Sequence, residues 1–169
     1  LVFEPAIWGL IVGNADALMA GDSVLTGKVV ARCAAWKRRI VDSDEREMKG
    51  PRELLNFGHT LGHALESVSG LGVLRHGEAV IWGMRAALRL SHRCSGLKAS
   101  FAADADRFLA TLPVPLPRRI EPRRLLDLAR RDKKARGGRA RFVLLRAPGR
   151  PVTAYVSDKE ILRAVREIL

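Results

Sequence analysis

Cysteine, aromatic residues and long apolar runs are all scarce in this sequence of 169 residues. Cys33 and Cys94 are the only cysteines and form no Cys-x-x-Cys pair, which argues against a disulfide scaffold and favours a reducing cytoplasm. Aromatic residues make up 5% of the chain. No uninterrupted apolar run approaches the roughly 20 residues of a membrane span. The apolar start at residues 1–20 also lacks a basic leader, so we expect neither a membrane helix nor a signal peptide.

The residues that are present favour one globular domain. A hydrophobic fraction of 47% with 28% charged residues is typical of a folded protein rather than a disordered one. The length is sufficient for a single domain with its own core. Ala, Leu and Arg dominate, which favours helix. We therefore expect one mainly α domain over residues 1–169. Because Leu1 opens directly on what looks like the middle of a helix, we expect this chain to be a piece of a longer protein.

The net charge is +12, and the excess is concentrated near the C-terminal end. Residues 118–150 contain 13 basic and 3 acidic side chains. Such a block is often found in nucleic-acid-binding proteins. Here Pro, Gly and aliphatic residues interrupt it, and aromatic side chains for base stacking are lacking. A solvated or phosphate-facing surface is the better interpretation, and we expect no nucleic-acid partner.

Hydrophobic periodicity and breaker residues predict the order of the elements. Pro51 marks a helix start, and Gly70 with Gly72 marks its end. After Gly137-Gly138 the period changes to that of a small β-hairpin. In the second helix we expect core positions at Val29, Val30, Cys33 and Ile40. The predicted helices cover residues 1–20, 23–41, 51–69, 79–90, 101–112, 123–131 and 158–169, and the hairpin strands cover 141–145 and 152–156.

A stripe of polar residues marks the predicted helix at 51–69. Arg52, Asn56, His59, His63 and Glu66 follow steps of 4, 3, 4 and 3, so about 100° per residue places them on one narrow helix face. Apolar residues normally occupy that spacing and are buried. Gly58 and Gly62 flank the stripe, although each costs a helix interior about 1 kcal/mol relative to Ala. We expect that something approaches the backbone closely at these glycines.

Three histidines are the first candidates for chemistry. His59 and His63 stand four residues apart, a spacing that allows a shared metal ion, although such pairs are often only solvated. Thr60 follows the first histidine, which excludes the metalloprotease motif with Glu at that position. His76 lies in a glycine-flanked loop and strengthens the case for a metal, since three protein ligands leave one position open for substrate. Glu78 either orients a ligand or, more simply, complements a helix N-terminus.

The His-rich region closely resembles the signature of the 3-dehydroquinate synthases, members of the sugar-phosphate cyclases. The resemblance rests on Asn-Phe-Gly-His-Thr at 56–60, Gly-His-Ala-Leu-Glu at 62–66 and His-Gly-Glu-Ala-Val at 76–80. Asp-Glu-Arg-Glu at 44–47 and Arg-Asp-Lys-Lys at 131–134 follow the family order. The resemblance extends over essentially the whole chain and implies the multi-helix C-terminal, metal-binding domain of that fold.

The resemblance also implies roles for individual residues. It makes Glu4, His59 and His76 the ligands of Zn²⁺, with Co²⁺ as the alternative metal. It gives His63 and Lys37 catalytic roles and places Arg52, Asn56, His63 and one of Lys133 or Lys134 on the substrate, a phosphorylated sugar acid. The implied reaction forms 3-dehydroquinate and phosphate in the shikimate pathway. It uses NAD held mainly by a preceding nucleotide-binding domain, in an enzyme expected to be a cytoplasmic homodimer.

Two departures from the family pattern keep other interpretations open. Ile7 stands where the family has a substrate-contacting lysine, which allows another sugar-phosphate cyclase with a different phosphorylated sugar. No Gly-rich βαβ fingerprint is present, so the NAD-binding domain is absent from this sequence. A chain without that domain is expected to bind zinc but not to turn over. A non-catalytic, zinc-binding helical remnant is the third interpretation.

Overall fold

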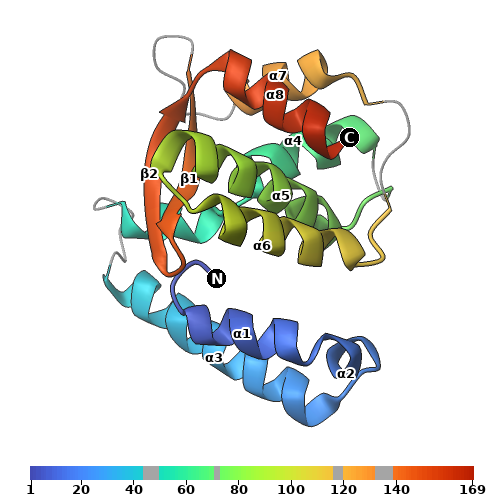
Figure 1. Cartoon of the computed structure of the whole chain (residues 1–169), viewed down its shortest axis with the longest axis vertical. Coiled ribbons are helices and arrows are strands. Elements are labelled where there is room, and N and C mark those ends of the chain that lie inside the picture. The colour runs from blue at the N-terminus through green and yellow to red at the C-terminus, as the bar shows by residue number, and fades with distance from the viewer. Residues whose placement is uncertain (44–49, 71–72, 116–119, 132–138) are drawn as a thin grey trace.

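The computed structural model describes residues 1–43, 50–70, 73–115, 120–131 and 139–169. It confirms a mainly helical domain with a two-stranded antiparallel sheet near the C-terminus (Figure 1). Within the described residues, no helix is both long enough and apolar enough to cross a membrane. The elements are α1 (Pro5–Gly13), α2 (Ala15–Met19), α3 (Ser23–Ser43), the 3-10 helix η1 (Pro51–Asn56), α4 (His59–Ser69), α5 (His76–Ser95), α6 (Ala99–Thr111), α7 (Pro122–Arg131), β1 (Ala140–Ala147), β2 (Arg150–Val156) and α8 (Asp158–Ile168).

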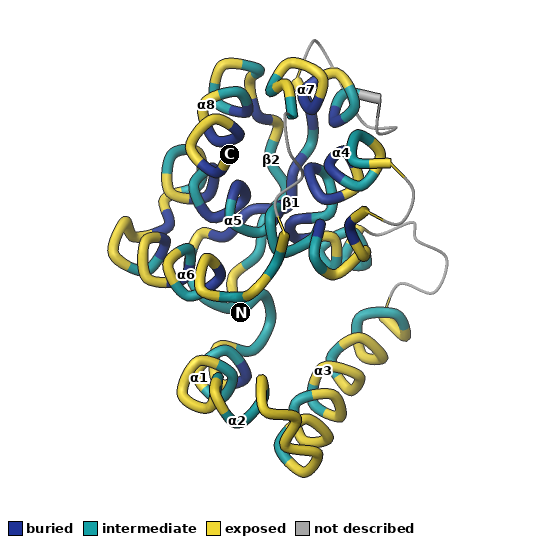
Figure 2. The backbone as a smooth tube through the Cα atoms, turned by 90° about the vertical axis from the view of Figure 1, so that its right-hand side faces the viewer, coloured by how far each residue is buried: buried dark blue, intermediate teal, exposed yellow. Residues whose placement is uncertain are grey.

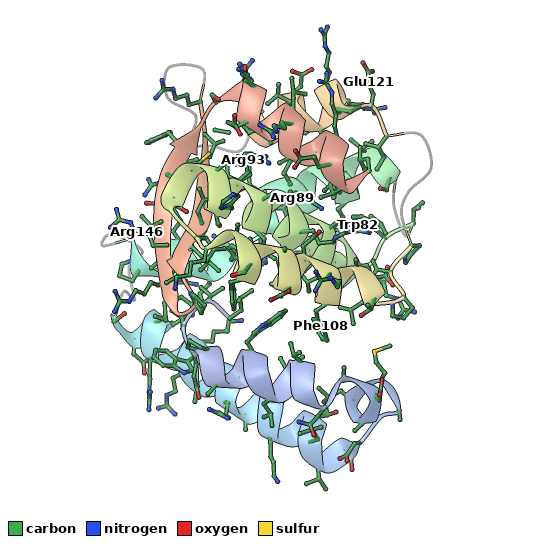
Figure 3. The ribbon with its side chains drawn as sticks, viewed as in Figure 1. Trp82, Arg89, Arg93, Phe108, Glu121 and Arg146 are labelled. Atoms are coloured by element: carbon green, nitrogen blue, oxygen red, sulfur yellow. The ribbon has the colours of Figure 1, made fainter. Side chains whose placement is uncertain are left out.

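Helix α5 is the central element of the fold and packs against α4, α6, α8 and β1 (Figure 1). Its buried positions include several small residues, Ala79, Gly83, Ala86 and Ala87, which allow neighbouring backbones to come close. Its other faces carry arginines that pair across helices. Arg89 contacts Asp106 of α6 at 2.6 Å, and Arg93 contacts Glu160 of α8 at 2.6 Å (Figure 3). These partly buried ion pairs help to fix α6 and α8 on the central helix.

The predicted hairpin is confirmed, with Phe142 opposite Ala154 and Leu144 opposite Val152. Strand β1 is mostly buried and β2 mostly half-buried, because β1 faces α5 and the core. Gly149 in the turn has a φ of +73°, a value that favours glycine. Its N–H donates to the Leu1 carbonyl at 2.9 Å, so the tip of the hairpin holds the N-terminal segment. The closing helix begins as predicted, with the Ser157 hydroxyl accepting from the Glu160 N–H.

The prediction of one helix over residues 1–20 was wrong. The helix is interrupted at Asn14, whose backbone has a φ of −133° and whose side-chain amide donates to the Leu10 carbonyl at 2.9 Å. An asparagine that bonds the local backbone in this way competes with the helical pattern. Helices α1, α2 and α3 form a separate layer beside the rest of the domain (Figure 1).

The predicted core of the second helix was also largely wrong. Helix α3 has no buried residue, Val30 is 59% exposed and Cys33 is exposed, while Val29 and Ile40 are half-buried. Figure 2 shows α3 mostly as an exposed tube at the edge of the molecule. Among the described residues, the elements that α3 contacts most are the short α1, α2 and η1, which cover too little of its surface to bury an apolar stripe.

The predicted single helix over 51–69 was wrong as well, because it divides into η1 and α4. The break lies at Phe57, with ψ of 121°, and Gly58, with φ of +83°. A Cβ on Gly83 of α5 would lie 1.9 Å from the Gly58 carbonyl oxygen and 2.8 Å from the Gly62 nitrogen. The expected close approach to these glycines is therefore real, and the approaching group is the backbone of α5.

Candidate active site

Three imidazole rings meet where α4 and α5 begin. His59 opens α4, His63 follows one turn later, and His76 opens α5. The ring centroids are 5.5 Å apart for His59 and His63, 5.3 Å for His59 and His76, and 5.6 Å for His63 and His76. Despite the helix break, His59 and His63 of the polar stripe still lie one turn apart on α4. The packing of α4 on α5 brings His76 beside them. We call His59, His63 and His76 the histidine cluster.

Two rings of the histidine cluster have an oxygen beside Nδ1. His59 Nδ1 lies 3.3 Å from the Phe57 carbonyl oxygen, and His76 Nδ1 lies 3.3 Å from Glu66 Oε2. When Nδ1 carries the proton and donates to that oxygen, the lone pair of Nε2 is available to a metal ion. A partner of this kind on the second nitrogen is usual for histidines that ligate metals. The donor chemistry of His59 and His76 therefore suits Zn²⁺ or Co²⁺.

The surroundings of His59 favour its neutral, ligating form. Partial burial lowers the pKa of His59, and the nearby His63 and His76 rings lower it further. The hydrogen bond to the Phe57 carbonyl opposes this decrease in pKa but does not outweigh it. Metal binding requires an unprotonated imidazole, so competition with protons at this residue is reduced.

His59 and Asn56 lie between two hollows. A cavity of about 380 Å³ is lined by Lys37, Arg52, Leu55, Asn56 and His59. A smaller one of about 150 Å³ is lined by Glu53, Asn56, His59, Thr60, His63, Ala129, Arg141 and Val143. The structure thus brings four of the predicted catalytic and substrate-binding residues, Lys37, Arg52, Asn56 and His63, around the first histidine. This arrangement can hold an anionic, hydroxylated molecule beside the imidazoles.

Arg141 is a member of this region that the sequence interpretation missed. It projects from β1 into the smaller cavity and pairs with Glu53 of η1 at 2.8 Å. Its position in the basic block gave no sign of this role, because Arg141 follows His59 by 82 residues and reaches the site only through the packing of β1 against α5 and η1. At least one basic side chain of residues 118–150, that of Arg141, thus contributes a positive charge to the site.

Glu4 is held apart from the histidine cluster. Trp36 Nε1 donates to its Oε2 at 2.5 Å, and Arg32 forms an ion pair with its Oε1. Glu4 lines a different, largely apolar cavity of about 400 Å³, which Lys37 also borders. Among the described residues, no group of three or more His, Cys, Asp and Glu side chains is placed to hold a metal ion. The assignment of Glu4 as a third ligand therefore stays a prediction.

Two other sequence predictions have simple outcomes. Lys133 and Lys134 lie outside the described residues. Glu78 has the simpler of its two proposed roles, because its Oε2 accepts from the Arg75 backbone N–H at 2.8 Å and caps α5. The acidic partner of His76 is Glu66, which the sequence had left without a role.

Ile7, which stands in place of the family lysine, is a packing residue. It is the buried residue of α1, 6% exposed, and lines the apolar cavity with Trp8 and Phe108. Replacing Ile7 by Lys should lower the free energy of unfolding by about 2 kcal/mol, because an ammonium group would enter an apolar contact. Urea unfolding followed by circular dichroism measures this, with Ile7→Val as the control that keeps the site apolar. Equal stability of the lysine variant and the wild type would show that the site tolerates a cation.

Comparison with known proteins identifies the family. The model of the family described as 3-dehydroquinate synthase C-terminal matches residues 1–135. The chain belongs to this family. It is 40% identical over 172 residues to a 3-dehydroquinate synthase of Pyrobaculum neutrophilum, covering 100% of this chain and 49% of the relative. It is 40% identical over 153 residues to that of Psychrobacter cryohalolentis, covering 90% and 41%. The chain thus spans less than half the length of these relatives.

Solved structures of 3-dehydroquinate synthase-like proteins share the fold. The 2-epi-5-epi-valiolone synthase of Streptomyces hygroscopicus, solved with NAD+ and Zn2+ bound, superposes with a TM-score of 0.79 at 22% identity, covering 99% of this chain and 47% of that chain. A 2-deoxy-scyllo-inosose synthase complexed with carbaglucose-6-phosphate, NAD+ and Co2+ gives 0.71 at 23% identity, covering 83% and 40%. At such identities the likeness establishes the fold alone.

Proposed function

We propose that this chain is the metal- and substrate-binding half of a 3-dehydroquinate synthase. That enzyme is a carbon-oxygen lyase acting on a phosphate, which converts 3-deoxy-arabino-heptulosonate 7-phosphate to 3-dehydroquinate and phosphate. The reaction belongs to the shikimate pathway of aromatic amino acid biosynthesis. One observation carries the proposal: in a chain of this family, His59 of the histidine cluster borders a cavity lined by Lys37, Arg52 and Asn56.

The metal ligands we propose are His59 and His76 through Nε2, with Glu4 as the third. Glu4 would have to leave Arg32 and Trp36 to join them, since these two residues hold both of its carboxylate oxygens. When bound, the metal ion supplies a Lewis acid for the substrate hydroxyl at which NAD accepts and returns a hydride. Zinc and cobalt both suit this mixed nitrogen and oxygen donor set.

The remaining site residues bind and orient the substrate. Arg52 and Lys37 offer charge-assisted hydrogen bonds to its carboxylate and phosphate, and Asn56 offers its amide to hydroxyl groups. His63 lies beside His59 and can pass a proton to or from the phosphate oxygen during elimination. One of Lys133 or Lys134 completes the cationic surroundings. Arg141, which pairs with Glu53, adds a further cation at the smaller cavity.

The cofactor half of the active site belongs to a nucleotide-binding domain that precedes this region in the family. We propose that this chain pairs with such a domain, in an enzyme that is a homodimer, and that residues 1–169 alone bind the metal ion without turnover. Ile7 favours one alternative, a sugar-phosphate cyclase that acts on a different phosphorylated sugar, because a cationic contact to the heptulosonate is lost there. A non-catalytic metal-binding module is the other alternative.

Genetic complementation tests the proposed activity. The chain is joined to the nucleotide-binding half of a related 3-dehydroquinate synthase and expressed in a bacterium that lacks this enzyme. We expect growth without added aromatic amino acids, and no growth with the chain alone or with a joined variant carrying His59→Ala. Failure of the well-expressed, zinc-loaded joined protein to restore growth would contradict the proposed reaction and favour another substrate.

A further inference from the structure

We propose that Glu66 is a positioning residue that sets the orientation and tautomer of His76 for metal binding. This inference rests on the proposed function, in which His76 is a metal ligand. Glu66 lies on α4, one helical turn after His63, and its Oε2 is 3.3 Å from His76 Nδ1 at the start of α5. The contact therefore joins the two helices on which the histidine cluster is built.

The exposure of His76 shows why such a partner is needed. Its side chain is 54% exposed, and that of Glu66 is 41% exposed. Packing therefore leaves the His76 ring free to adopt several rotamers. A carboxylate on α4 selects the rotamer in which Nδ1 faces α4. In that rotamer Nε2 points away from Glu66 and is available to a metal ion shared with His59, whose ring centroid is 5.3 Å from that of His76.

The carboxylate also determines which nitrogen carries the proton. An ionised carboxylate only accepts hydrogen bonds, so Nδ1 must be the protonated nitrogen of the neutral ring. The Nε2 lone pair is then free, and the negative partner makes it a stronger donor to a metal ion. His59 has the same arrangement, with the Phe57 carbonyl oxygen in the place of the carboxylate.

Glu78 provides a matched control, because it is the other glutamate near His76. Its carboxylate accepts the Arg75 backbone N–H at 2.8 Å and caps α5. Glu78→Gln removes one negative charge two residues from His76 and leaves the Glu66 contact in place. If zinc affinity depends on negative charge near His76 in general, variants of Glu66 and Glu78 should both lose affinity. If it depends on the orientation of the His76 ring, only variants of Glu66 should lose affinity.

The experiment measures zinc affinity and the tautomer of His76 in the full 169-residue chain. Zinc affinity comes from competition with a chelating dye, and ¹⁵N NMR of the imidazoles at alkaline pH without metal identifies the protonated nitrogen. We expect Glu66→Ala to weaken zinc binding about tenfold, as for other partners of metal-ligating histidines. It should also shift His76 towards the Nε2-protonated tautomer. Glu66→Gln, whose side-chain oxygen still accepts a hydrogen bond, should restore the tautomer and most of the affinity, and Glu78→Gln should change the affinity less than twofold.

Two results would overturn the inference. One is an unchanged His76 tautomer in Glu66→Ala, and the other is an equal loss of zinc affinity in Glu66→Ala and Glu78→Gln. Failure of the proposed function is a distinct result, namely a wild-type chain that binds no zinc. In that case the tautomer measurement still decides whether Glu66 orients His76.

Discussion

Replacing His59 by Ala is expected to weaken zinc binding by this chain about 100-fold or more. Loss of an outer partner of a ligating histidine costs about 10- to 100-fold in affinity, and loss of the ligand itself removes the metal–nitrogen bond as well. The three rings of the histidine cluster are about equally spaced, and His59 is the one that borders the cavity of Lys37 and Arg52. Isothermal titration with zinc, and the visible absorption of the cobalt complex, measure the effect.

His92 supplies the matched control for that experiment. It is the fourth histidine of the chain, lies near the end of α5, and has its Nδ1 3.0 Å from the Leu97 carbonyl oxygen. His92→Ala should leave zinc affinity within about twofold of the wild-type value, because this ring is not part of the histidine cluster. Equal losses in the two alanine variants, or a His59→Ala chain that binds zinc as the wild type does, would refute the proposed ligand.

The second large effect is expected at Gly83. Replacing Gly83 by Ala should lower the free energy of unfolding by about 3 kcal/mol, because overpacking a filled contact usually costs about 1–3 kcal/mol and here the obstacle is backbone. The new Cβ would lie 1.9 Å from the Gly58 carbonyl oxygen and 2.8 Å from the Gly62 nitrogen. This steric clash is relieved only if α4 and α5 move apart. Zinc affinity should therefore fall as well, since the same two helices carry His59 and His76.

Gly77 allows a comparison within the same helix. A Cβ on Gly77 would meet no atom within 4 Å. Gly77→Ala should therefore leave stability unchanged or raise it by up to about 1 kcal/mol, as expected from helix propensity. Urea unfolding of both variants makes the comparison. Similar stabilities for Gly83→Ala and Gly77→Ala would show that the contact between α4 and α5 is not tight.

Much of the fold follows from local signals in the sequence. The hairpin was predictable because a short apolar, strand-like run at 141–145 follows two glycines and precedes a second run rich in β-branched residues. The closing helix was predictable from Ser157 and Glu160, which form its N-terminal cap. The histidines were predictable as a group, because their motifs resemble a known family. In each of these places, local preference and the final packing agree.

Where tertiary contacts determine the backbone, the sequence interpretation failed. Steps of four and three residues predicted a continuous helix through Phe57 and Gly58. The requirement for α5 to contact the backbone of α4 places Gly58 in a left-handed conformation and ends the helix there. Periodicity describes one element at a time, so it could not foresee a contact with Gly83, which lies 25 residues later.

The composition of the site was likewise only partly predictable. Arg141 and Glu53 pair across a long sequence separation, and the contact of Glu66 with His76 exists only because two helices meet. The spacing of the polar stripe indicated that Glu66 and His63 share a helix face, but it could not show which residue Glu66 contacts. The position of Glu4 beside Arg32 and Trp36 could not be inferred from its motif, because both partners belong to a different helix.

Phosphate release tests the central claim most directly. Purified protein is incubated with 3-deoxy-arabino-heptulosonate 7-phosphate, NAD and zinc, and inorganic phosphate is measured over time. The chain alone is compared with the chain joined to the nucleotide-binding half of a related 3-dehydroquinate synthase. We predict phosphate release by the joined protein, its loss with the His59→Ala variant, and none by the chain alone. Turnover by residues 1–169 alone, or a joined and zinc-loaded protein that releases no phosphate, would contradict the account.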